Sequence, residues 1–211
     1  MNTNTAPPRR RAVQARSRAT VERILASAAA LIAERGADAV TMTEIAQRAE
    51  VVIGSLYQYF PDRAGVMAAL CERHNADVRQ MLVDGIAGVA SLDGLTGRIE
   101  AITSRYFTLH REDPLFQGLW AAVQTDPTLQ ALDVADSLRN ADILFAAARP
   151  LYRAVDEDRL RTTCALVMQL VLSAARFALA IPEPLSGLSA GVFSTMVRSA
   201  FLALEDQGPT V

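Results

Sequence analysis

The sequence contains no lysine, only two cysteines, two histidines and one tryptophan among its 211 residues. The two isolated thiols, Cys71 and Cys164, argue against a disulfide framework and favour a reducing cytoplasm. No apolar stretch follows the arginines at positions 9 to 11, so no signal peptide is expected. The most apolar window, 164–181, contains Gln169 and Arg176, which favours a buried interface helix over a membrane span.

Strand-like alternation of apolar and polar residues is also missing, whereas segments rich in alanine and leucine are frequent. Hydrophobic residues make up 51% of the chain, enough for a large core, so we expect an all-α protein. Charge is unevenly distributed: residues 1–63 hold nine arginines against six acids, a net of +3, whereas residues 64–211 hold twelve against seventeen, a net of −5. A basic head and an acidic body are typical of a protein that meets phosphate at one end only.

The segment 41–63 has the pattern of two short helices joined by a tight turn. Thr41 and Glu44 form a capping-box pair at the start of the first helix. In the second helix, Leu56 and Phe60 are expected to face inward, and the hydroxyls of tyrosines 57 and 59 can donate to phosphate. This is the helix-turn-helix layout, which places one helix in the DNA major groove.

The same segment resembles the DNA-binding domain of the TetR family of transcriptional repressors. The signature I-A-x-x-A, then G-x-L-Y-x-Y-F, then a basic residue, is matched by Ile45, Ala46, Ala49, Gly54, Leu56, Tyr57, Tyr59, Phe60 and Arg63. The match extends upstream through Thr20, Ile24, Leu25, Ala28, Leu31, Gly36 and Thr41.

The resemblance implies a cytoplasmic regulator without a cofactor or catalytic activity. It would bind a palindromic double-stranded DNA operator as a homodimer and release it when an unknown small ligand binds. The residues expected at the DNA are Thr41, Thr43, Val52, Ile53, Gly54, Ser55, Tyr57, Gln58, Tyr59 and Arg63.

Three residues depart from the family pattern. Glu50 stands where glycine is usual in the turn, so the ease of glycine at positive φ is lost. Val52 replaces a serine or threonine cap, which predicts a less tightly started helix. Ile53 replaces a polar residue, so direct readout would depend on Ser55, Gln58 and apolar contacts with thymine methyl groups.

Helical periodicity and the positions of glycine and proline predict about nine helices. We expect a disordered basic arm over residues 1–15, a DNA-binding domain over 16–63, and a helical domain for ligand binding and dimerisation over 64–211. A helix over 129–155, bent at Pro150, is part of this prediction. The arm has two interpretations, insertion into a minor groove or a solubilising tail.

The middle helices combine aromatic residues with a few polar ones, as a small-molecule site requires. The alternative is that these aromatics are only core. The family resemblance implies a cavity, which would take an apolar or aromatic ligand, with Arg105 or Arg139 available for a carboxylate. The residues expected to line it are Arg105, Tyr106, His110, Phe116, Trp120, Gln124, Arg139 and Phe145.

Two apolar rows near the C-terminus predict a two-fold four-helix bundle between subunits. One row is Leu160, Cys164, Val167, Val171, Ala175 and Leu179; the other is Leu188, Val192, Met196 and Ala203.

Other interpretations belong to different classes of protein. The run 187–191 matches G-x-S-x-G, which would make Ser189 a hydrolase nucleophile, but that motif needs a preceding strand and a downstream histidine, and both histidines lie upstream. Cys71, His74 and Asp77 share a helix face, but no second ligand cluster completes a metal site, so no metal is expected. A sequence-independent architectural DNA-binding protein is the remaining alternative.

Overall fold

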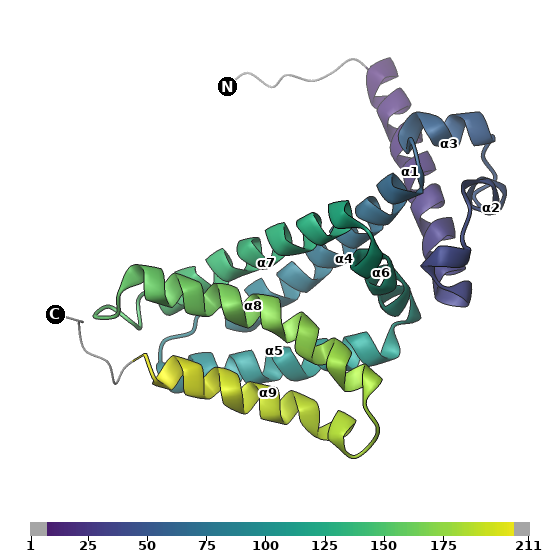
Figure 1. Cartoon of the computed structure of the whole chain (residues 1–211). Helices are drawn as coiled ribbons and strands as arrows, with labels where there is room; N and C mark the ends of the chain where they lie inside the picture. Colours follow the sequence, from purple (N-terminus) through teal and green to yellow (C-terminus); the bar gives the residue numbers. More distant parts are fainter. Residues whose placement is uncertain (1–7, 205–211) are drawn as a thin grey trace. The chain divides into compact units, whose positions relative to one another are not determined.

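The computed structural model describes residues 8–204, and side chains from residue 13 onward. These residues form nine α-helices and one short 3-10 helix without any strand, which confirms the all-α prediction (Figure 1). The elements are α1 (Pro8–Arg35), η1 (Ala37–Ala39), α2 (Met42–Arg48), α3 (Ile53–Tyr59), α4 (Arg63–Ile86), α5 (Leu92–Glu112), α6 (Pro114–Thr125), α7 (Pro127–Ala148), α8 (Glu157–Ala180) and α9 (Leu185–Leu202).

The described chain divides into two compact units. Unit 1 comprises residues up to Glu72 together with 114–125, and unit 2 comprises 73–113 together with the chain from Asp126 onward. Helix α4 passes from one unit into the other. Unit 1 therefore holds the helix-turn-helix and α6, whereas unit 2 holds α5, α7, α8 and α9.

Unit 1 is built on the C-terminal half of α1, which packs against α2, η1 and α6. Ile24, Ile45 and Leu56 from three different helices are fully buried in its core. The contact of α6 with α1 is very close, because a Cβ added to Gly118 would lie 2.5 Å from Cγ2 of Ile32. Glycine is thus required at this position by packing.

Unit 2 is a layered helical body in which α8 packs on both α7 and α9, and α5 lies along α9 (Figure 1). Leu95, Leu144, Leu160 and Phe201 are fully buried between these helices. Tyr152, beyond the end of α7, donates its hydroxyl to the carbonyl oxygen of Phe201 at 3.1 Å and so ties this segment to the end of α9. The core of unit 2 is therefore continuous through all four helices.

Two expectations about segments are wrong. Residues 8–15, expected to be disordered, form the first turns of α1, while residues 1–7 of the expected arm lie outside the described residues. Helix α7 ends at Ala148 and does not continue with a bend to residue 155. Pro150 has no amide hydrogen for the helical ladder, and the chain turns between 149 and 156 instead.

Candidate nucleic-acid interface and effector site

The first helix of the helix-turn-helix, α2, begins with the predicted capping box. Thr41 Oγ1 accepts a hydrogen bond from the Glu44 amide at 3.3 Å, and the Thr41 amide donates to Glu44 Oε2 at 3.0 Å. Arg35 from the end of α1 donates to the same carboxylate at 2.9 Å. This hydrogen bond from Arg35, followed by those from Thr41, lowers the pKa of Glu44 to about 2. The capping carboxylate therefore stays ionised at physiological pH.

A second ion pair holds α2 against α1. Arg48 binds Glu34 through both terminal nitrogens, at 2.7 and 2.6 Å, and lowers the pKa of that carboxyl group. Beneath these surface contacts, Ile45, Ala46 and Ala49 are buried, as their spacing predicts. The two ion pairs and the apolar face together fix α2 on α1, so that α3 has a rigid support.

The second helix, α3, packs one side into the core of unit 1 and exposes the other side. Leu56 and Phe60 are buried, as expected. On the opposite side, Val52 is 74% exposed, Ile53 38% and Tyr57 50%. Other residues predicted to contact DNA are also exposed on this motif, namely Thr41, Thr43, Gly54 and Gln58, while Ser55 and Tyr59 are half-buried.

The turn between the two helices shows both predicted departures from ideal geometry. Glu50 has a φ of 52°, the left-handed region that favours glycine, and it is the one non-glycine residue with positive φ in the described chain. Val52 at the N-cap of α3 makes no side-chain capping hydrogen bond. The turn is therefore formed at a local cost in conformational energy.

The Arg63 side chain, which was expected to contact phosphate, is bound to other residues of unit 1. Its Nη1 donates to the carbonyl oxygen of Ala37 at 2.8 Å and lies 3.9 Å from Asp38 Oδ1. The guanidinium is part-exposed, but it joins the start of α4 to η1 within unit 1. Any role of Arg63 at DNA would be combined with this structural one.

Polar side chains are buried inside the apolar body of unit 2. His110 is fully buried and Tyr106 is 8% exposed, with ring centroids 3.9 Å apart. His110 Nδ1 lies 2.8 Å from the Tyr106 carbonyl oxygen, so the tautomer protonated at Nδ1 donates there. Burial lowers the pKa of His110 to about 3 and raises the pKa of Tyr106 well above its usual value. Both side chains are neutral at pH 7.

Helix α7 contributes acidic groups to this interior that sequence reasoning missed. Asp136 is buried, forms an ion pair with Arg79 of α4 and accepts a hydrogen bond from Asn140 Nδ2 at 3.0 Å. Asp133, one turn earlier, faces Gln169 of α8 at 3.5 Å, and burial raises its pKa. The spacing 133, 136, 140 puts three polar groups on one face of an apolar helix, and that was the signal available in the sequence.

The structure separates the predicted effector residues into several groups. Arg105 and Arg139 are exposed, and Arg139 Nε donates to the Ala135 carbonyl oxygen of its own helix at 3.3 Å. They are therefore poorly placed to bind a carboxylate in the interior. Phe116, Trp120 and Gln124 belong to α6 in unit 1, where Phe116 is buried.

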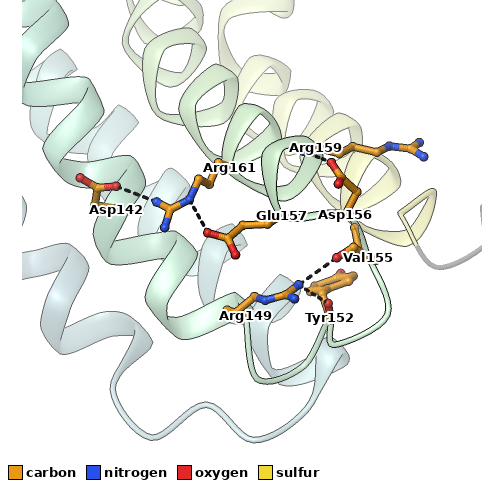
Figure 2. Close-up of polar contacts among 8 residues, drawn as sticks. All are labelled: Asp142, Arg149, Tyr152, Val155, Asp156, Glu157, Arg159 and Arg161. Atoms are coloured by element: carbon orange, nitrogen blue, oxygen red, sulfur yellow. Dashed lines mark hydrogen bonds and ion pairs between the residues drawn. The ribbon is translucent and has the colours of Figure 1, made fainter. Parts of the chain in front are cut away.

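Phe145, the remaining predicted residue, borders an open surface groove of about 640 Å³ at the junction of α7 and α8. The Arg161 guanidinium covers its ring at 3.9 Å from the centroid. Figure 2 shows the polar contacts that two arginines of this groove, Arg149 and Arg161, make around the turn between α7 and α8. Arg149 donates to the carbonyl oxygens of residues 152 and 155, both at 2.9 Å, and Arg161 bridges Glu157 and Asp142.

Helices α8 and α9 each have two apolar faces. The row predicted on α8 for a subunit contact is largely internal, because Leu160, Cys164, Val167 and Ala175 are buried within the chain. Val171 is half-buried, and Leu179 alone of that row is exposed. The exposed face of α8 carries Leu166, Leu170 and Phe177.

On α9 the predicted row is exposed: Leu188 is 60% exposed, Val192 58% and Met196 64%, and Ala203 is exposed at the end of the helix. We call the exposed set the apolar face; it consists of Leu166, Leu170, Phe177, Leu185, Leu188, Val192 and Met196. By length and composition alone, both helices could cross a membrane. Each nevertheless buries one side against other helices of unit 2.

The hydrolase alternative lacks its structural context. Ser189 lies inside α9, where its hydroxyl donates to the Leu185 carbonyl oxygen at 2.8 Å, and no strand precedes it in the described chain. Among the residues described, no group of three or more histidine, cysteine or acidic side chains could hold a metal ion.

Comparison with known families finds two matches along the chain. The family model described as bacterial regulatory proteins, tetR family, matches residues 24–70. The model described as tetracyclin repressor-like, C-terminal domain, matches residues 93–184. An uncharacterised HTH-type transcriptional regulator of Mycobacterium tuberculosis is 28% identical over 167 residues, which is 70% of this chain and 88% of the relative.

Solved structures show the same fold. RolR in complex with resorcinol has a TM-score of 0.66 and 22% identity, over 94% of this chain and 99% of RolR. The complex of SmeT with triclosan has a TM-score of 0.64 and 23% identity, over 86% of this chain and 91% of SmeT. SmeT is the repressor of a multidrug efflux pump of Stenotrophomonas maltophilia.

Proposed function

Because the chain belongs to the TetR family of bacterial transcriptional regulators, we propose that it is a cytoplasmic repressor whose ligand releases it from DNA. It binds a palindromic operator as a homodimer and dissociates when a small apolar or aromatic ligand occupies the helical body. Residues 16–63 are the DNA-binding domain, and residues 64–211 bind ligand and the second subunit. The observation that carries the proposal is α3, which is anchored by Leu56 and Phe60 and exposes its other face.

The exposed face of α3 determines how the operator would be read. Gln58 and Ser55 supply hydrogen-bonding groups for base edges, while Val52 and Ile53 are suited to thymine methyl groups. The hydroxyls of tyrosines 57 and 59, with those of threonines 41 and 43, would donate to phosphate and set the register. Readout through few polar groups predicts an operator with an A·T-rich core in each half-site.

Selection from a random library of double-stranded DNA tests this function directly. The full-length protein should enrich a palindrome whose half-sites are centred about one helical turn apart. Gln58→Ala should change the enriched bases, and Gln80→Ala, an equivalent change on the exposed side of α4, should not. Enrichment of no sequence, with tight binding to all DNA, would establish the architectural alternative instead.

The apolar face supports the proposed homodimer. Seven large apolar side chains exposed on two adjacent helices exceed what a monomer surface usually presents in one place. Packing this face on its symmetry copy gives a four-helix bundle of α8 and α9 from each subunit. The dimer is needed for function because a palindrome is bound by two copies of α3.

The interior of unit 2 supports a small effector that is partly aromatic and carries a few polar groups. Tyr106 and His110 supply two buried aromatic rings, and Asp133, whose charge acts on Tyr106, supplies hydrogen-bonding groups together with Gln169. RolR and SmeT bind aromatic compounds, so resorcinol and triclosan are suitable first probes. A ligand should release the protein from its operator, and Tyr106→Ala should weaken that release more than Phe145→Ala. Equal effects of the two variants would place the effector elsewhere.

A further inference from the structure

The N-terminal turns of α1 extend beyond the packed part of unit 1. The first core residue of α1 is Ile24, which is fully buried. Between residues 13 and 23 no side chain is buried, and Val13 is 60% exposed. In Figure 1 the purple end of α1 continues past α3 of the same unit. Residues 8–23, which we call the basic extension, therefore form a helix of about 24 Å in which none of the side chains described, from residue 13 onward, is buried.

The basic extension has a strong positive charge. It contains six arginines against one acid, Glu22, a net of +5. Within the described part of the chain, the guanidinium groups of Arg16, Arg18 and Arg23 are exposed and form no hydrogen bond or ion pair. By contrast, Arg35 and Arg48, where unit 1 is packed, each bind a glutamate.

Such a helix is poorly stabilised without a partner. Its first turn contains no acidic residue, so the arginines there oppose the positive end of the helix dipole. A helix of about 16 residues is marginal in water by itself, and from residue 13 to residue 23 this segment buries no side chain fully. An anionic partner would remove the repulsion between the arginines and stabilise the helix at the same time.

The spacing of the arginines gives the extension two charged sides. Arg16 and Arg23 are seven residues apart, which places them on one side of the helix about 10.5 Å apart. Arg18 lies on a different side, so both flanks of the extension are basic. A distance of 10.5 Å corresponds to about three base pairs along a DNA strand. Regular anionic groups along a groove match this spacing better than a single small anion.

We propose that the basic extension binds phosphate groups of double-stranded DNA outside the bases contacted by α3. This inference rests on the proposed operator binding, since it adds contacts to the same complex. DNA is favoured as the partner because the extension and the exposed face of α3 belong to one compact unit. The rest of the chain supports this choice, because residues 64–211 carry a net charge of −5, whereas residues 1–63 carry a net charge of +3.

The test uses the full-length protein and the palindrome enriched from random DNA. The extension variant carries three changes to glutamine, at Arg16, Arg18 and Arg23. The control variant carries the same three changes in unit 2, at Arg105, Arg153 and Arg159. Both variants lose three charges, and circular dichroism checks that both stay folded. Affinity is measured against salt on one duplex with ten flanking base pairs on each side and on one trimmed to the half-sites.

On the flanked duplex, the extension variant should lower the slope of log affinity against log salt by about 2.7 per protomer. On the trimmed duplex the difference from wild type should largely disappear, and the control variant should match wild type on both. An unchanged slope on the flanked duplex overturns the inference, as does an equal loss on both duplexes.

If wild-type protein enriches no DNA sequence, the proposed function fails, which is a separate result. Vesicles containing phosphatidylserine test the other anionic partner. Sedimentation with vesicles that depends on the three arginines, together with unchanged DNA binding, would assign the extension to a membrane surface and overturn the proposal.

Discussion

Met196 gives the most direct test of the apolar face. It is 64% exposed on α9 and lies in line with Val192 and Leu188, so it should be buried at the centre of the dimer. Complete burial of a side chain of this size is worth about 1.5–3 kcal/mol, so covering the exposed fraction stabilises the dimer by about 1–2 kcal/mol per copy. Met196→Ala removes most of this from both subunits, a loss of about 2–4 kcal/mol per dimer.

That loss raises the dimer dissociation constant by about 30- to 700-fold. Sedimentation velocity of fluorescently labelled protein, from nanomolar to micromolar concentration, measures the change. Val83→Ala is the matched control, since Val83 is 41% exposed on α4 of the same unit and lies outside the apolar face. The thermal stability of the folded monomer should stay the same, because Met196 contributes little to the core.

Two results would refute this reasoning. A wild-type protein that is monomeric at micromolar concentration would show that the face does not join two copies. An unchanged dissociation constant for Met196→Ala would show that the dimer forms elsewhere. A charge at Ala175 must be interpreted differently, because that residue is 2% exposed inside the subunit. Ala175→Asp should lower the melting temperature of the subunit itself.

Three further changes test local features of the fold. Glu50→Gly should raise the free energy of unfolding by about 0.5 kcal/mol, since relief of the left-handed conformation exceeds the chain entropy of glycine; a lower melting temperature would contradict this. Because the folded pKa of His110 is about 3, below the usual 6.5, the unfolded chain takes up the proton first, and stability falls as pH drops below 6.5. Urea unfolding measures this: between pH 7 and pH 5, the free energy of unfolding of His110→Gln should fall by about 2 kcal/mol less than that of the wild type. Gly118→Ala should destabilise unit 1 by about 1–3 kcal/mol through its clash with Ile32, measured by thermal melting. Gly97→Ala, which has open space around the added methyl group, should stabilise the protein slightly in the same measurement.

The helix-turn-helix could be predicted in detail because its signals are local. The capping box between Thr41 and Glu44 depends on residues three apart, and the structure confirms it. The positive φ at Glu50 also follows from the turn alone, as does the absence of a side-chain cap at Val52. Such features are decided by neighbouring residues, so tertiary packing has little opportunity to change them.

The effector region was harder to predict, because a polar residue on an apolar helix can either face solvent or be buried in the interior. Arg105 and Arg139 were placed in a cavity, yet both are exposed. Asp136 and Asn140, which are buried, have similar sequence surroundings on the same helix as Arg139. Which polar side faces inward depends on the partner helices, and here the Arg79 ion pair from α4 stabilises the buried Asp136.

The row predicted on α8 for the subunit contact is mostly buried within the chain, and the physical reason for this difference also concerns the proposed dimer. Periodicity identifies one apolar side when the other is polar, but Cys164 and Leu166 belong to opposite apolar sides of the same helix. Only 28% of the most apolar window of α8 and 22% of that of α9 is buried within the chain. A helix of this kind needs a second apolar environment, either lipid or protein. The operator proposed above is a palindrome that needs two recognition helices, so a second copy of the chain would supply both the apolar environment and the second helix with one contact. The two apolar sides of α8, which made the contact row difficult to predict, are thus also the property from which we infer the dimer.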